Sequence, residues 1–417
     1  MRENPAAPRR EVPLAEARAS ILEQLRSHPA ALRVQKLDYT EAAGHVLARE
    51  LRAGSGLPPF ARSTRDGYAL RAADLDAALA SRGGRLRLAG EIRAGGETIE
   101  LPAESCIEIM TGAPLPAGAD AVVMFEHARA EGGDIVFSRP ARPGDNFVPA
   151  GQEAAAGSIV LPRWRRLHAA GAGLLASIGC VAPMVFDRPR VALLVTGDEL
   201  VAPWQTPAGA QIRDANSALL AARVAACGAV PLPLPIARDH PGELATSLAR
   251  GLAEADLLVI SGGASAGRYD FTRAALEKLG AEFYFDAVRI RPGRPAVFGR
   301  ARNAFFYCLP GNPVSALVTF ELLVRPALAA LSGEPPETWL RPFDLAELDS
   351  EFRGPALPLV SFVPVRSLAG GSRPRLAPLA YHGSGDLVAA AAADAFLLVP
   401  EGCDRIAAGS LVEMFWN

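Results

Sequence analysis

Three segments between residues 256 and 320 limit the fold most strongly, because in each one an apolar run leads directly into a loop rich in glycine or proline. They read DLLVISGGASAGRYDF, VRIRPGRPAVFG and FFYCLPGNPVSALVTF. Apolar strands that end in such loops and are followed by helices predict an α/β sheet whose ligand lies beyond the carboxyl ends of the strands. Exposed N–H groups at helix starts, together with Arg291 and Arg294, favour negative charge. We therefore expect a soluble enzyme that handles a small phosphorylated or oxyanionic ligand.

The length and composition of the chain narrow the class of protein. A chain of 417 residues is long enough for several domains of about 150 residues each. A net charge of −2 gives no electrostatic reason to expect nucleic acid or a lipid surface as partner. The five cysteines are far apart and form no CxxC pair, which indicates free thiols in a reducing cytosol. The charged N-terminus is expected to be a short frayed tail and the protein to be cytoplasmic.

One stretch, residues 167–186, is as long as the roughly 20 apolar residues that span a bilayer. Three glycines and a proline interrupt it, and arginines lead from it into another apolar strand. We therefore expect a buried helix that leads into a strand, and no membrane insertion.

The order of patterns along the chain predicts an α/β multidomain protein of four parts. Residues 1–50 and 149–187 form a helical N-terminal or linker domain, with one helix on the apolar face of residues 14–25 and a second around Thr40–Leu47. Residues 51–148 form an inserted β-rich domain, with strands at RLRLAGEI, SCIEIM and AVVMFEH. Residues 188–334 form an α/β domain, and residues 335–417 form a C-terminal β domain that ends in FLLVPEG and SLVEMFW.

Within the α/β domain, strands and helices alternate. Strand VALLV precedes a helix over Ala218–Cys227 that Asn216 or Ser217 can cap, then strand VPLPLPI, a helix over Glu243–Glu254 and strand DLLVI. Two βαβ steps with right-handed crossovers predict a doubly wound, mostly parallel sheet.

The loop PGNPVS at 310–315 is the most specific local signal. Asn312 is placed to cap a helix that begins at Pro313, which leaves the following N–H groups and the Ser315 hydroxyl facing outward toward an anion. On these six residues alone, the alternative is an ordinary strand-to-helix turn with good capping.

Three further loops have similar chemistry and similarly ordinary alternatives. SGGASAG at 261–267 offers glycines for close backbone approach and hydroxyl donors, and Asp270 follows it as a helix cap or a magnesium ligand. TGDEL at 196–200 ends a strand with two carboxylates, which also suit a helix start. RPGRP at 291–295 offers two guanidinium groups or a solvated basic turn. We expect all four loops to meet at one edge of the sheet, which favours a binding site over four unrelated turns.

The β-rich part has two compact polar loops, RSTRDGYALR at 62–71 and MTGAPLPAGADAVV at 110–123. The six histidines are scattered and suit neither a Ser-His-Asp triad nor a zinc site. Hydrolase and zinc-enzyme functions are therefore disfavoured.

Together these motifs resemble the molybdopterin molybdenumtransferase family, which performs the final step of molybdenum cofactor assembly and includes the C-terminal domain of gephyrin. The resemblance runs from about residue 13 to the C-terminus and includes LPPF, DGYA, the GSG at 383–385 and the VPEG ending besides the loops above. It implies a homodimer of four-part protomers. It also implies that adenylylated molybdopterin and molybdate react, with a divalent cation, to give molybdenum cofactor and AMP. Molybdopterin adenylyltransferase is a further candidate partner.

The resemblance also implies roles for single residues. Glu199, Asp270 and Asp239 would be catalytic, with Glu199 and Asp270 as ligands to Mg²⁺. Molybdate would lie near Arg291, Arg294 and Ser315. The substrate-binding set is Asp66, Thr111, Thr196, Gly197, Asp198, Ser261, Gly262, Gly263, Ser265, Arg291, Arg294, Pro310, Gly311, Asn312, Pro313 and Ser315.

The chain departs from the usual family pattern at several charged positions. Ala61 stands where an acid is usual, Arg65 where a methionine is usual, Gln152 with Glu153 replaces an acidic pair, and Arg268 replaces an acid. Losing a carboxylate weakens a cation site, and an added arginine favours an anionic ligand. The alternative to the transferase is therefore a non-catalytic paralogue that binds molybdopterin or the finished cofactor as a carrier or scaffold.

Overall fold

The structure is a computed structural model that describes residues 10–238, 240–262, 268–370 and 373–417, with only the backbone of residues 268–270. The chain divides into two compact units. The second consists of Arg49–Arg163 and Ala169–Pro183, and the first holds the other described residues, including Trp164–His168 and Met184–Asn417. The four-part division given above stays a prediction.

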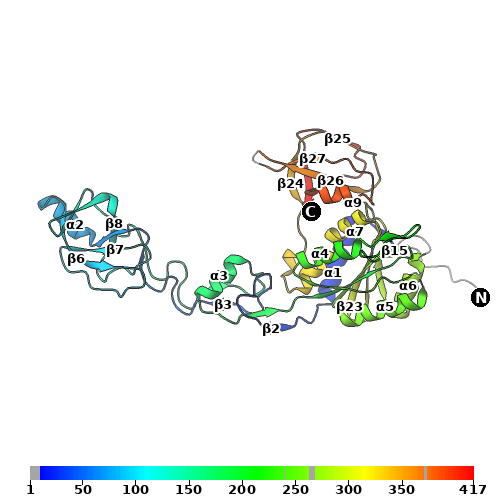
Figure 1. Ribbon diagram of the computed structural model, residues 1–417, viewed down its shortest axis with the longest axis horizontal. Helices are drawn as coiled ribbons and strands as arrows, with labels where there is room; N and C mark the ends of the chain where they lie inside the picture. The colour runs from blue at the N-terminus through cyan, green and yellow to red at the C-terminus, as the bar shows by residue number, and fades with distance from the viewer. Residues whose placement is uncertain (1–9, 239, 263–267, 371–372) are drawn as a thin grey trace, which may run out of the picture. The chain divides into compact units, whose positions relative to one another are not determined.

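A six-stranded sheet forms the centre of the first unit, as the alternating pattern predicts (Figure 1). The first four strands in its order are parallel, and the last two run antiparallel to their neighbours. The order is β17 (Val230–Pro233), β14 (Arg190–Val195), β18 (Leu257–Ser261), β23 (Ala304–Leu309), β22 (Val297–Ala301) and β19 (Glu282–Phe285).

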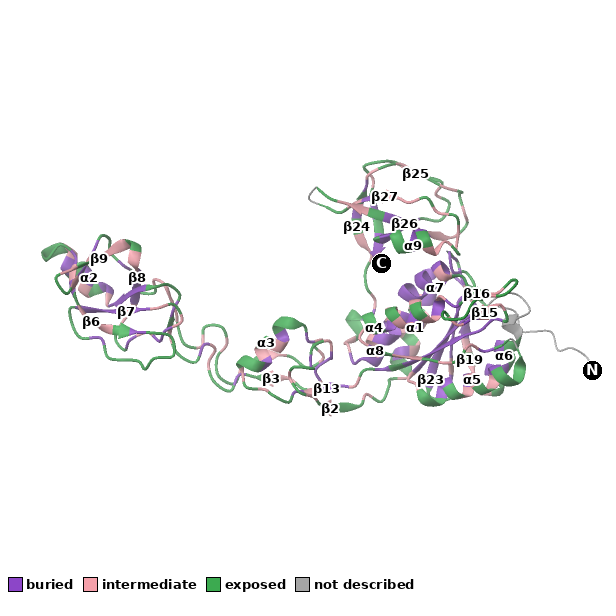
Figure 2. Cartoon of the chain, in the orientation of Figure 1, coloured by how far each residue is buried: buried purple, intermediate pink, exposed green. Residues whose placement is uncertain are grey.

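Helices cover both faces of this sheet because successive residues of a strand point to opposite faces. Val191 and Leu193 of β14 pack with α1 (Leu14–Ser27), α4 (Asn216–Ala226), α7 (Pro313–Thr319) and α8 (Arg325–Leu331). Ala192 and Leu194 pack with α5 (Pro241–Glu254) and α6 (Arg268–Lys278) on the other face. The central strands β18 and β23 are accordingly buried along their whole length, and β14 along all but its first residue (Figure 2). The fold is therefore doubly wound.

Helix Pro313–Leu331 is apolar enough to cross a membrane by length and composition, but 89% of its apolar 18-residue stretch is buried inside the protein. It comprises α7, a π-helical turn (η2, Phe320–Val324) and α8. This burial is what the core helix of a globular protein shows.

The stretch 167–186 forms the short helix α3 (Ala169–Ser177), followed by strand β13 (Met184–Phe186). Only Gly171 and Leu175 of α3 are buried, so the prediction of a buried helix was right about the helix and wrong about its burial.

The C-terminal residues form a second sheet of the first unit, in the order β21–β26–β27–β24–β30–β28, with β28 also paired to β26. The bounds are β21 Ile290–Arg291, β26 Val360–Leu368, β27 Arg375–Pro378, β24 Asp344–Leu348, β30 Leu411–Trp416 and β28 Ala395–Val399, with α9 at Leu387–Ala392. FLLVPEG and SLVEMFW are strands, as predicted. Because β21 pairs with β26, Arg291 is held against the C-terminal sheet.

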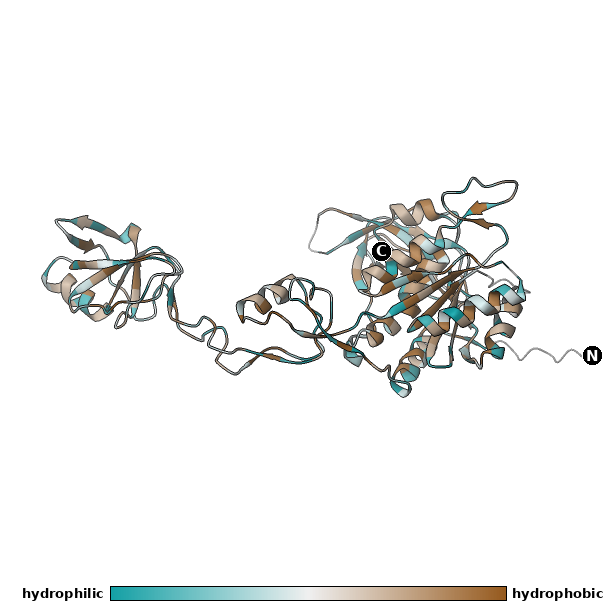
Figure 3. Ribbon diagram, turned by 60° about the horizontal axis from the view of Figure 1, so that its bottom comes forward, coloured by the Kyte–Doolittle hydropathy of each residue, from teal (hydrophilic) through white to brown (hydrophobic). Residues whose placement is uncertain are grey.

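The second unit has its own six-stranded sheet, which confirms the predicted strands. The order is β8 (Ala121–Met124), β5 (Gly67–Leu70), β7 (Ser105–Ile109), β6 (Arg85–Ile92), β10 (Asp134–Phe137) and β9 (Ala128–Glu131). Figure 3 shows apolar residues along these strands. Helix α2 (Ala72–Ser81), which buries Ala72, Leu75 and Ala78 against the sheet, was not predicted.

The predicted helix around Thr40–Leu47 was wrong. Val46 forms a bridge to Arg166 and Leu47 to Val185, and Gly44 has a positive φ of 85°, so pairing with distant segments replaces a helix there. The remaining short pairs are β1 (Glu11–Val12) with β20 (Ala287–Val288), β2 (Val34–Lys36) with β13, β3 (Leu51–Arg52) with β12 (Ile159–Leu161), β4 (Arg62–Ser63) with β11 (Phe147–Val148), β15 (Leu200–Val201) with β16 (Ile212–Arg213), and β25 (Phe352–Arg353) with β29 (Arg405–Ile406).

Candidate functional site

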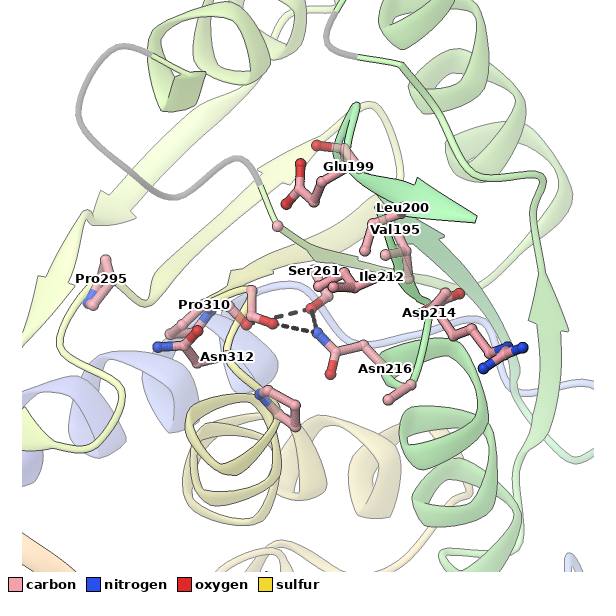
Figure 4. Close-up of a pocket in the computed structure, with 16 residues that line it drawn as sticks. Val195, Glu199, Leu200, Ile212, Asp214, Asn216, Ser261, Pro295, Pro310 and Asn312 are labelled. Carbon is pink, nitrogen blue, oxygen red and sulfur yellow. Dashed lines mark hydrogen bonds between the residues drawn. The ribbon is translucent and has the colours of Figure 1, made fainter. Parts of the chain in front are cut away.

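A cavity of about 380 Å³, here called the strand-end cavity, lies at the carboxyl ends of β14, β18 and β23 (Figure 4). The chain passes from β14 to β17 on one side and then to β18 on the other, so this is the switch point at which open α/β sheets bind ligands. The lining residues are Val195, Thr196, Glu199, Leu200, Ile212, Arg213, Asp214, Ala215, Asn216, Ser261, Gly262, Pro295, Pro310, Gly311, Asn312 and Pro313. The TGDEL, SGGASAG and PGNPVS loops each contribute at least two residues to this lining, and the RPGRP loop contributes Pro295 alone.

Asn216 ties two of these loops together, a role that the sequence did not reveal. Its side-chain amide donates to Ser261 Oγ at 2.8 Å and to the Gly311 carbonyl at 2.7 Å. Asn216 is therefore not the cap of α4, and neither is Ser217; instead the Asp214 carboxylate accepts from the Ser217 backbone N–H at 3.0 Å. Asn216 and Asp214 are both buried and both line the cavity.

Gly262 is required by the protein's own backbone. Its φ is +100°, and a Cβ there would lie 2.2 Å from the Thr196 carbonyl oxygen. Because only glycine tolerates that approach, the β14 and β18 loops can pack against each other at the cavity floor. The glycine was predicted to let the backbone approach a ligand; the approach that the structure shows is to Thr196.

The TGDE segment forms a turn that leads into strand β15, so the alternative of an acidic helix start was wrong. Thr196 is buried, and Glu199 lies at the edge of the cavity across from Asn312. Asp198 is exposed, and its backbone carbonyl accepts a hydrogen bond from the Arg238 guanidinium at 2.8 Å. Gly197 is buried but does not line the cavity. Glu199 is thus the carboxylate of this loop best placed to meet a ligand.

The start of α7 differs from the prediction. Pro313 is its first residue, but the Asn312 side chain makes no cap; its amide donates instead to Ser384 Oγ at 2.6 Å. The Ser384 carbonyl accepts the Val314 N–H at 3.1 Å. Ser384 belongs to the GSG segment, so a C-terminal loop occupies part of the helix start that was expected to hold an anion.

A second cavity of about 500 Å³, here called the arginine cavity, brings together Arg291, Arg294 and Ser315. It shares Pro295, Pro310 and Asn312 with the strand-end cavity, so the two are neighbours. Ser315 is buried at 4% exposure and lines this cavity, and the prediction that its hydroxyl faces a bound anion stays a prediction.

The two arginines differ in their electrostatic surroundings. Arg294 is bound by both oxygens of Glu11, at 2.7 and 3.0 Å, and these hydrogen bonds lower the pKa of the Glu11 carboxyl. For Arg291 the described residues provide no ion-pair partner, and the side chain is exposed. The charge of Arg294 is therefore balanced by Glu11, whereas that of Arg291 is not balanced by a carboxylate of the described residues.

Asp66 and Thr111 contact each other in the second unit. The Asp66 carboxylate accepts from the Thr111 backbone N–H at 2.6 Å and from its hydroxyl at 2.8 Å. These hydrogen bonds lower the pKa of Asp66 and keep it ionised. The two predicted residues thus form one rigid anionic loop pair.

Several predicted residues cannot be placed. Asp239, Gly263 and Ser265 lie outside the described residues, and for Asp270 only the backbone, in the first turn of α6, is described. In the described part of the chain no group of three potential metal-ligating side chains is found. Mg²⁺ is commonly held by one or two carboxylates together with substrate phosphates, and Glu199, which lines the strand-end cavity, supplies one such carboxylate.

Comparisons with known proteins agree along nearly the whole chain. Residues 12–179 match the MoeA N-terminal region (domain I and II), residues 192–330 a probable molybdopterin binding domain, and residues 355–415 the MoeA C-terminal region (domain IV). The molybdopterin molybdenumtransferase of Haemophilus influenzae is 37% identical over 79% of each chain. That of Nostoc sp. is 34% identical over 89% of this chain and 86% of its own.

Solved structures give the same result. The molybdopterin biosynthesis MoeA protein of Pyrococcus horikoshii superposes with a TM-score of 0.74 at 31% identity, covering 97% of this chain and 98% of its own. A second structure of a MoeA protein from that organism gives a TM-score of 0.78 at 26% identity, with 97% and 100% covered. The sequence resemblance and the predicted multidomain α/β fold are therefore confirmed, and the chain belongs to the MoeA family, several of whose members carry the name molybdopterin molybdenumtransferase.

Proposed function

We propose that this protein is a molybdopterin molybdenumtransferase, which inserts molybdate into adenylylated molybdopterin and releases AMP. The observation that carries the proposal is the pair of neighbouring cavities: one at the strand ends beside Glu199, and one beside Arg291 and Ser315. The reaction requires such neighbouring sites, because the phosphoanhydride that is cleaved and the dithiolene that receives molybdenum belong to the same substrate molecule. The names of the relatives support the same assignment.

The strand-end cavity takes the adenylate and the phosphate in this proposal. Gly262, Ser261 and Thr196 line this cavity. Backbone N–H groups of glycine-rich loops are suitable hydrogen-bond donors to phosphate oxygens. Molybdate lies in the arginine cavity in this proposal, because Arg291 and Ser315 both line it and a guanidinium and a hydroxyl are suitable donors to an oxyanion. Arg294 contributes less, since Glu11 already binds it.

A divalent cation, Mg²⁺ in the proposal, is held by Glu199 and Asp270 with the substrate phosphates, and Asp239 assists. When bound it neutralises charge on the departing AMP. Glu199 supplies a carboxylate at the cavity edge, and Asp214 is a further candidate on the opposite side. AMP leaves when an oxygen of molybdate or water forms a new bond to phosphorus and the phosphoanhydride P–O bond breaks, so no protein nucleophile is needed.

The anionic pair of Asp66 and Thr111 is assigned to substrate binding in a homodimer. Molybdopterin adenylyltransferase is proposed as the enzyme that delivers the substrate, and the cytoplasm as the site of the reaction. A measured monomer at micromolar concentration would remove the dimeric part of this proposal while leaving the cavities intact.

The test is AMP release from adenylylated molybdopterin by the purified protein, with and without molybdate. The transferase releases AMP only when molybdate is present. A carrier or scaffold, the alternative that the substitutions at Ala61, Arg65, Gln152 and Arg268 favour, binds the pterin and releases none.

A further inference from the structure

A third cavity, here called the C-terminal cavity, opens between the RPGRP turn and the C-terminal sheet. It has a volume of about 380 Å³, and it shares Arg291, Pro292, Leu357 and Tyr381 with the arginine cavity. The three cavities thus follow one another, from the strand ends past Arg291 into the C-terminal sheet.

The lining of the C-terminal cavity differs from that of the other two. Phe352, Phe362, Val363 and Leu379 provide apolar and aromatic walls. Its volume lies within the roughly 300–1,000 Å³ of small-molecule pockets, which are largely apolar with a few polar groups that fix orientation. A flat ring with apolar faces and polar groups along its edge therefore suits it, because aromatic walls and the polar residues Glu351, Ser361 and Tyr381 line the same space.

Two polar groups here could orient such a ligand. The hydroxyl of Tyr381 is buried without a hydrogen-bond partner among the described side chains and backbone, and burial raises its pKa to about 12, so it stays a donor. Glu351 lines the cavity and is fixed by Arg353 and by Arg405, the latter at 2.6 Å. These arginine hydrogen bonds lower its pKa and keep it an acceptor.

The order of the cavities matches the order of groups in the proposed substrate. In adenylylated molybdopterin the nucleotide and phosphates occupy one end, the dithiolene that receives molybdenum lies in the middle, and the pterin occupies the other end. We propose that the C-terminal cavity is the subsite for the pterin ring, with Tyr381 as a donor to it. This inference rests on the proposed function, which places phosphate at the strand ends and molybdate beside Arg291.

The experiment measures binding of free pterin and, separately, of AMP to the full-length protein by equilibrium dialysis. Val363→Trp fills the cavity and should weaken pterin binding by about tenfold or more, while AMP binding stays within about twofold. Tyr381→Phe removes only the hydroxyl, and the loss of one neutral hydrogen bond should weaken pterin binding by about threefold to tenfold. Tyr307→Phe is the matched control, because the Tyr307 hydroxyl is also buried without a described partner but lies in the α/β core; it should leave both ligands unaffected.

The inference is overturned if pterin shows no saturable binding, or if it binds equally to wild type, Val363→Trp and Tyr381→Phe. Unchanged AMP binding shows that each variant is folded. AMP release from the complete substrate separates this result from the proposed function. If the wild type releases AMP but neither Val363→Trp nor Tyr381→Phe weakens pterin binding, only the subsite is wrong. If both substitutions weaken pterin binding but the wild type releases no AMP, only the transferase assignment fails.

Discussion

Replacing Asn216 by alanine tests whether one side chain holds the floor of the strand-end cavity. Asn216→Ala removes the hydrogen bonds to Ser261 Oγ at 2.8 Å and to the Gly311 carbonyl at 2.7 Å. Ser261 keeps a second partner, the Pro310 carbonyl at 3.3 Å, whereas no other hydrogen bond to the Gly311 carbonyl is described. Gly311 is exposed, so water can replace the lost donor at its carbonyl, and the cost is mainly that of the two lost hydrogen bonds.

The magnitude follows from these contacts. Each of the two lost hydrogen bonds contributes about 0.5 to 1.5 kcal/mol, and the exposed Gly311 carbonyl adds no penalty for a buried unpaired group. The Asn216 Oδ1 atom is itself buried without a described hydrogen-bond partner. Removing this atom therefore restores part of the lost folding free energy. We expect the free energy of unfolding to fall by about 2 kcal/mol and AMP affinity to fall by about tenfold, since the two loops are no longer tied together.

Urea unfolding and AMP binding of the two proteins check this expectation. Asn312→Ala is the matched control, because Asn312 lines the same cavity but is exposed, and its amide bonds only Ser384 Oγ; its unfolding free energy should change by less than about 1 kcal/mol. The reasoning is refuted if Asn216→Ala is as stable as wild type and binds AMP equally well.

Three further substitutions have defined outcomes. Glu199→Gln should abolish AMP release while pterin binding persists, and turnover that survives in single-turnover assays would exclude Glu199 as a cation ligand. Arg291→Ala should raise the apparent dissociation constant for molybdate by roughly ten- to a hundredfold, which corresponds to the loss of a contact of about 1.5 to 3 kcal/mol. Arg294→Ala should raise it less, because Glu11 already balances the charge of Arg294. Equal effects of the two substitutions in molybdate titrations would contradict this ranking. Gly262→Ala should lower the melting temperature strongly, because a Cβ would lie 2.2 Å from the Thr196 carbonyl oxygen, and an unchanged melting curve would show that the loops can separate without cost.

The central sheet and the meeting of its loops could be predicted from the sequence because both depend on local patterns. Apolar runs such as DLLVI mark buried strands, and parallel strands necessarily bring their carboxyl ends to one edge. The glycine and proline residues after each strand then mark the site. This local information was sufficient to place Thr196, Ser261 and Pro310 around one cavity.

The contacts that modify the site could not be predicted, because their partners are distant in sequence. Glu11 meets Arg294 across 283 positions, and Ser384 meets Asn312 across 72. No local pattern shows that the cap of α7 is replaced by a C-terminal loop, or that one arginine of RPGRP is neutralised. The failed helix at Thr40–Leu47 has the same cause, since long-range bridges at Val46 and Leu47 override its local pattern.

The most direct test of the central claim is a single-turnover reaction that measures released AMP and protein-bound molybdenum together, per protomer, with adenylylated molybdopterin, molybdate and Mg²⁺. The proposed transferase gives equal amounts of both, and Arg291→Ala requires more molybdate to reach the same amounts. AMP release that does not depend on molybdate, or bound pterin with no AMP released at any molybdate concentration, would contradict the assignment.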